Sequence, residues 1–149
     1  VEVFGGLLVH DNLNVSGNKN FVQTVDTADG KREVAYTACE APTPRTEVSG
    51  VAELEDGRAM VELPVHFGWV TSDDEPLVVE TTPYSADSNG LAVVERSPER
   101  VVFEDLEGEG DYEFSYTVRG TREGHADKEV VREPSPEASE NASPTPADD

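Results

Sequence analysis

The residues whose chemistry could support catalysis or metal binding are few and widely spaced. His10, His66 and His125 lie far apart, and Cys39 is the single cysteine. A structural zinc site takes four Cys or His ligands, usually in closely spaced pairs, so this spacing predicts no zinc site. The sequence also contains no Gly-x-Ser-x-Gly nucleophile turn, no Gly-Lys-Ser/Thr phosphate loop and no Gly-x-Gly-x-x-Gly dinucleotide motif. We therefore predict that the protein is not an enzyme and has neither catalytic residues nor a cofactor.

Carboxylates are the one abundant polar group, and two clusters of them could offer oxygen ligands to Ca²⁺. The clusters are Asp73-Asp74-Glu75 and the segment 104–111. The second cluster lacks the alternating Asp-x-Asp-x-Asp-Gly order of an EF-hand loop. Because 32 acidic residues guarantee some close pair, paired carboxylates do not indicate a glycoside hydrolase here. We interpret both clusters as solvated turns and keep a Ca²⁺ site as the alternative.

The charge composition restricts both the partners and the environment of the protein. The 149 residues include 32 acidic and 11 basic ones, which gives a net charge of -21. Nucleic acid and anionic membranes repel such a surface, and no segment approaches the roughly 20 apolar residues of a membrane span. Molar salt shortens the Debye length to about 3 Å and removes most of the self-repulsion. We therefore predict a halophilic surface, no nucleic-acid partner and no membrane insertion. The alternative is an acidic interaction protein from a non-halophile.

The elements that position these groups are predicted to be strands. Alternating apolar and polar residues form short runs between turn residues such as Asp29-Gly30 and Asn89-Gly90. The Glu55-Asp56-Gly57 turn predicts that two of these runs, 46–54 and 58–63, form a hairpin. No window shows a sustained helical period, so we predict an all-β, sandwich-like or barrel-like domain over residues 19–131. The runs cover residues 21–25, 33–39, 46–54, 58–63, 77–82, 91–95, 101–104 and 112–118.

Residues 1–18 contain a six-residue repeat. Leu7 and Val9 are followed at the same spacing by Leu13 and Val15, and each pair precedes a turn-forming Asp-Asn or Gly-Asn. Residues two apart share one face of a strand, and a six-residue period suits the rungs of a β-solenoid. Because two rungs cannot bury their own apolar face, we predict a β-stalk that self-associates through these four residues. A trimer suits such short apolar stripes, and the alternative is a plain hairpin.

The stalk is expected to meet the domain at Lys19, Phe21 and Glu40. A buried ion pair between Lys19 and Glu40 would fix this junction, and breaking such a pair costs about 3–5 kcal/mol. The alternative is an exposed Lys19 among many acidic residues. Cys39 and Trp69 lie in apolar surroundings of the sequence, so both are expected to be buried. The alternative for Trp69 is an exposed side chain at a subunit contact or a glycan-binding face.

The last segment, 132–149, contains four prolines and five acidic residues and no large apolar residue. This composition cannot form a core, and it predicts a disordered acidic tail.

The chain resembles a β-rich domain found near the C-termini of long, repetitive fibre-like proteins. Gly17-Asn18-Lys19-Asn20-Phe21-Val22 resembles the Gly-x-Lys-Asn-Phe motif that opens this domain. Later segments resemble its other strands in the same order, and the likeness spans roughly residues 4–122. These segments are 36–42, 50–54, 57–67, 77–83 and 114–122.

This resemblance implies a structural protein of the phage tail-fibre or extracellular surface-fibre type, commonly trimeric, located outside the cell or on a virion. The acidic surface and tail depart from the family and point to a haloarchaeal cell or its virus. The alternative function is a receptor-binding or glycan-binding tip, with a host-surface glycan or S-layer protein as partner and the loops 73–76 and 85–90 as candidates. Asn14 and Asn141 each begin an N-glycosylation acceptor triplet.

Overall fold

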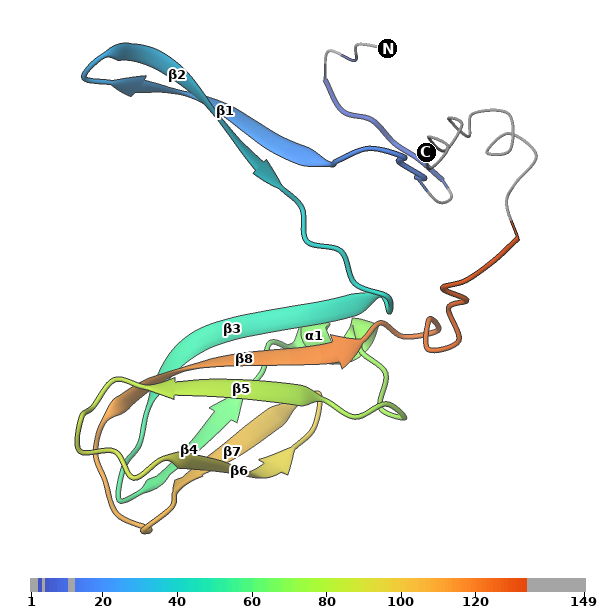
Figure 1. Ribbon diagram of the computed structural model, residues 1–149. Coiled ribbons are helices and arrows are strands. Elements are labelled where there is room, and N and C mark those ends of the chain that lie inside the picture. The colour runs from blue at the N-terminus through green and yellow to red at the C-terminus, as the bar shows by residue number, and fades with distance from the viewer. Residues whose placement is uncertain (1–2, 4, 11–12, 134–149) are drawn as a thin grey trace, which may run out of the picture. The chain divides into compact units, whose positions relative to one another are not determined.

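The computed structural model describes residues 3, 5–10 and 13–133 (Figure 1). The chain divides into two compact units, Val1–Glu40 and Ala41–Asp149. The division falls after Glu40 rather than after residue 18, where the sequence suggested a boundary. The reason is that the first two strands pair only with each other and so group with the N-terminal segment.

The N-terminal unit contains one antiparallel hairpin. Strand β1 (Asn20–Thr27) pairs with β2 (Gly30–Thr37) in full register, from Asn20 opposite Thr37 to Thr27 opposite Gly30. Gly30 has a φ of 98°, which a residue without Cβ adopts readily, and its carbonyl accepts a 2.7 Å hydrogen bond from the Thr27 hydroxyl. The predicted turn at Asp29-Gly30 is therefore confirmed.

The second unit is a sandwich of two open, three-stranded antiparallel sheets (Figure 1). One sheet has the order β3-β8-β5 and the other the order β4-β7-β6. The prediction of an all-β fold is confirmed, and because neither sheet closes, a barrel is excluded. The elements are β3 (Arg45–Glu53), β4 (Arg58–Glu62), α1 (Val65–Val70), β5 (Val78–Pro83), β6 (Leu91–Arg96), β7 (Arg100–Asp105) and β8 (Glu113–Thr121).

The hydrophobic core lies between these two sheets. Side chains alternate along β3, where every second residue from Thr46 to Ala52 is half-buried and the others are exposed. On β7 and β8, Phe103 and Phe114 are fully buried. The buried core comprises Leu54, Ala59, Leu63, Phe67, Leu77, Val101, Phe103, Phe114 and Val118.

The expected hairpin of residues 46–54 and 58–63 is wrong in its pairing, although its turn is correct. Asp56 and Gly57 have φ values of 51° and 75°, as a tight turn requires. Beyond the turn, however, β3 pairs with β8 and β4 pairs with β7, so the two strands enter different sheets. This arrangement buries Leu54 completely between the sheets, a gain that a flat hairpin lacks.

The helix α1 was not predicted. It is only six residues long, it follows Pro64, and no side chain caps its N-terminus. Phe67 is its one buried residue, whereas Trp69 is 76% exposed. The expectation that Trp69 is buried is therefore wrong, because Trp69 follows Phe67 by two residues, about 200° around the helix, and so faces away from the core.

The described part of residues 1–18 contains no strand. The described residues of this segment therefore do not confirm the predicted stalk. The predicted disordered tail, 132–149, lies outside the described residues except for Arg132 and Glu133.

Candidate functional site

The first candidate site is the apolar stripe of the N-terminal segment. Leu7 and Leu13 are 66% and 63% exposed, and Val9 and Val15 are also exposed. Exposed apolar side chains repeated at short intervals along one segment mark a surface that binds another apolar surface. The four residues predicted to form the oligomer interface are therefore accessible for that role.

The predicted pair at the junction forms, but at the surface. Lys19 Nζ lies 3.0 Å from Glu40 Oε1, and the two side chains are 46% and 70% exposed. The same end of the hairpin is closed by a 2.8 Å hydrogen bond from the Ala38 N–H to the Lys19 carbonyl. An exposed ion pair contributes about 0–1 kcal/mol, so the expectation of a buried pair is corrected. The pair is exposed because the described part of this unit has no hydrophobic core that could bury it.

Phe21, the third predicted junction residue, lies directly opposite Tyr36 in the hairpin register. Their side chains are 59% and 71% exposed. Cys39, just beyond β2, is exposed as well, which corrects the expectation that it is buried. Most large apolar side chains in the described part of the N-terminal unit are therefore exposed.

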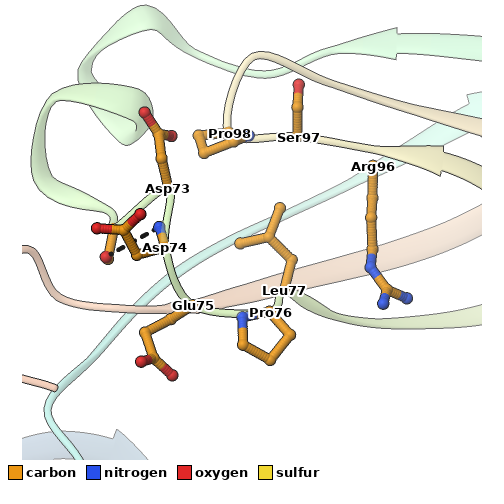
Figure 2. A pocket seen from close by; sticks show the side chains of 9 residues that line it. Asp73, Asp74, Glu75, Pro76, Leu77, Arg96, Ser97 and Pro98 are labelled. Atoms are coloured by element: carbon orange, nitrogen blue, oxygen red, sulfur yellow. Dashed lines mark hydrogen bonds between the residues drawn. The ribbon is translucent and has the colours of Figure 1, made fainter.

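The second candidate site is a hollow of about 340 Å³ on the sandwich (Figure 2). It lies between the loop 72–77, which joins α1 to β5, and the turn at the end of β6. Leu77 and Pro98 give it apolar walls, while Asp73, Asp74 and Arg96 supply charge. Carboxylates that accept hydrogen bonds and a guanidinium that donates them, beside apolar walls, suit a ligand rich in hydroxyl groups.

Backbone contacts hold the loop in place. The N–H of Ser72 donates to the Thr121 carbonyl at the end of β8, over 2.9 Å. The Ser72 hydroxyl in turn accepts a 3.3 Å hydrogen bond from the Asp74 N–H, the dashed line of Figure 2. Ser72 is buried, so this end of the hollow rests on the sandwich itself. The loop 73–76 named from the sequence does line a hollow.

A second hollow of about 250 Å³ shares Glu75 and Pro76 with the first. Arg45 and Arg119 line it. Arg119 is held between Glu47 on β3 and Glu80 on β5, and these two hydrogen-bonded carboxylates raise the pKa of its guanidinium. The two hollows therefore flank one short segment, with acidic groups prominent in the first and arginines in the second.

The other loop named from the sequence, 85–90, does not line either hollow. It instead joins a partly buried polar cluster: the Ser88 hydroxyl donates to Tyr112 Oη over 2.8 Å, and Tyr112 donates to Asp105 Oδ2 over 2.6 Å. The Tyr112 hydroxyl, and then the backbone N–H of Glu107, hold the pKa of Asp105 below its ordinary value. Burial, and then Asp105, raise the pKa of Tyr112. With its polar atoms satisfied, this cluster fixes the loops rather than binding a ligand.

Within the described residues, no group of three or more His, Cys, Asp or Glu side chains is placed to hold a metal ion. The same residues include no helix that is long and apolar enough to cross a membrane. Comparison with protein-family models, with curated proteins and with solved structures finds no match to the chain.

Proposed function

We propose that the protein is a self-associating structural module of an extracellular or virion-surface fibre. One observation carries this proposal: none of the described residues of the N-terminal unit is buried. The unit nevertheless contains many large apolar side chains, whereas the sandwich, although it exposes some of its own, also has a buried core. Apolar surface of this extent is stable in water only when another surface covers it. The exposed groups are Leu7, Leu8, Val9, Leu13, Val15, Phe21, Val22 and Tyr36.

In this proposal, the segment 1–18 forms a β-stalk with identical chains, a trimer being the expected assembly, and the sandwich stands at the end of the stalk. The resemblance to the terminal domains of fibre proteins supports this order of parts. The net charge of -21 supports a halophilic setting, where salt screens repulsion between neighbouring chains.

The mass of the full chain in about 3 M salt, measured by light scattering or sedimentation, tests the proposal. We expect an oligomer, and we expect the double substitution Leu7→Ser with Leu13→Ser to weaken it. Leu106→Ser is the matched control, because Leu106 is 65% exposed but lies on the sandwich. A wild-type chain that stays monomeric at all concentrations would contradict the proposal.

The hollow of Figure 2 favours a second function, recognition of a surface glycan by the sandwich. A hollow with apolar walls and convergent polar groups is the usual form of a small-ligand site. The two functions are compatible, since a fibre tip both ends the fibre and meets the surface that it binds.

A further inference from the structure

The β1–β2 hairpin has one face that is apolar at its open end and through its middle. Directly opposite residues of an antiparallel pair lie on the same face, and alternate residues share it. The register places Phe21 opposite Tyr36, Gln23 opposite Val34, and Val25 opposite Arg32, which is the one charged residue among these three pairs. Phe21, Val25, Val34 and Tyr36, here called the hairpin face, therefore form one surface.

Nothing within the described part of the N-terminal unit covers this face. The side chains of Phe21 and Tyr36 are more than half exposed, and those of Val25 and Val34 are only partly buried. The hairpin is a two-stranded sheet, so β1 and β2 each also have one edge with no partner strand among the residues that the structure describes. A two-stranded hairpin alone is marginally stable in water, and free edges readily pair with other strands. The hairpin therefore needs a partner surface to be stable.

The charge of the hairpin indicates which partner fits. Residues 19–40, which include the Lys19–Glu40 ion pair, contain three basic and four acidic residues: Lys19, Lys31 and Arg32, and Asp26, Asp29, Glu33 and Glu40. The net charge of this segment is therefore only -1, although the chain carries -21. Two copies can meet here with little of the repulsion that separates them elsewhere. A basic partner protein would instead be attracted to the acidic sandwich.

We propose that the hairpin face binds the hairpin of a second copy of this chain. The inference rests on the proposed self-association and adds an interface to it, separate from the Leu7/Val9/Leu13/Val15 stripe. Contact between two such faces buries the aromatic pair of each copy, and aromatic side chains contribute most strongly when buried at interfaces.

The test substitutes Phe21→Ser together with Tyr36→Ser in the full chain, in about 3 M salt. We expect the oligomer to dissociate to single chains, or to need at least about tenfold higher concentration, because two aromatic anchors are lost. Tyr84→Ser is the matched control, since Tyr84 is 59% exposed, like Phe21, but lies on the sandwich. We expect this control to associate like the wild type.

The single cysteine provides a second readout of the same contact. Cys39 is exposed and lies two residues beyond β2, so a spin label attached there reports distances between copies. We expect dipolar coupling between labels in the wild type and in Tyr84→Ser, and its loss in the Phe21/Tyr36 variant. A Val34→Glu variant, which places a charge in the middle of the hairpin face, should lose the coupling too.

The outcomes separate this inference from the proposed function. If the Leu7/Leu13 variant dissociates while the Phe21/Tyr36 variant remains fully associated, the fibre proposal stands and the hairpin interface is wrong. If the wild type itself is monomeric, both fail, and a hairpin that docks on its own sandwich would give that result. Dissociation of the Phe21/Tyr36 variant with an unchanged sandwich unfolding curve supports the interface.

Discussion

Phe103 on β7 and Phe114 on β8 meet edge to face between the two sheets, with ring centroids 4.9 Å apart. The two strands are consecutive in the chain but belong to different sheets, so this contact joins the layers of the sandwich. Both side chains are fully buried. The described part of the N-terminal unit has no equivalent contact, because its two aromatic side chains, Phe21 and Tyr36, are exposed.

Truncation of this central contact should destabilise the sandwich strongly. We expect Phe114→Ala to lower the free energy of unfolding by about 3–5 kcal/mol, since it removes buried apolar surface and leaves a cavity. Urea unfolding followed by circular dichroism measures the change. Phe21→Ala is the control and should leave the sandwich transition where it is. Equal effects of the two substitutions would contradict the division into two units.

The Asp105–Tyr112 hydrogen bond should make stability depend on pH at the acidic end. The folded state holds the pKa of Asp105 below its ordinary value of about 3.9. The stabilisation is therefore fully present above that pH and is lost as the pH falls through the folded-state pKa. In Asp105→Asn, this part of the acid dependence should disappear.

Thermal unfolding between about pH 2 and pH 6 at constant salt measures this effect. Tyr112→Phe removes the largest cause of the shift and should move the acid limb toward higher pH. Substitution of Asp26, an exposed acidic residue of the hairpin, provides the control. Identical acid limbs in the wild type and in Asp105→Asn would contradict the role of this cluster.

The strands were predictable because local pattern determines them. Alternation along residues 46–54 and the glycines of the turns are signals that each segment carries by itself. The pairing of β3 with β8 was not predictable, since it depends on residues that are far apart in the sequence. The turn at Asp56-Gly57 even favours the wrong partner, and only the burial of Leu54 between the sheets explains the observed one.

The candidate sites were predictable to a smaller extent. Lys19 and Glu40 pair as expected, but both side chains are exposed. Their exposure follows from the lack of a core around them, and no local sequence pattern could have indicated that. The loop 73–76 was predicted as a candidate because binding residues often lie on loops that a rigid scaffold positions. The opposite wall of the hollow, the turn with Arg96 and Pro98, was not predicted to line a site. This turn lies near the loop only because the two sheets pack together.

One like-charge pair should make stability increase with salt. Glu53 lies directly opposite Glu113 at the end of the β3–β8 pairing, and both residues are exposed. Like charges opposite each other are destabilising, so Glu113→Gln should raise the free energy of unfolding by about 0.2–1 kcal/mol at low salt. In about 3 M salt the gain should vanish, because the charges are screened.

The control substitution for this pair should change the free energy of unfolding in the opposite direction. Glu47 accepts a hydrogen bond from Arg119, so Glu47→Gln should slightly lower stability at low salt, by about 0–1 kcal/mol. Urea unfolding of both variants across a salt series gives the comparison. A salt-independent effect of Glu113→Gln would show that charge repulsion is not what the substitution relieves.

The hollow between the loop 72–77 and the β6 turn should bind glycan through Arg96. Among the described residues, Arg96 forms no ion pair, so its guanidinium is available to donate hydrogen bonds to a ligand in the hollow. We expect the full chain to bind surface oligosaccharides on an array in about 3 M salt, and Arg96→Ala to weaken binding about tenfold or more. Arg122→Ala is the matched control, because Arg122 lines neither hollow. Equal binding by both variants would show that the glycan binds at another site.

Because the hollow lies within the sandwich, the Phe21/Tyr36 variant should keep the affinity of each site and lose only the avidity that several linked copies provide.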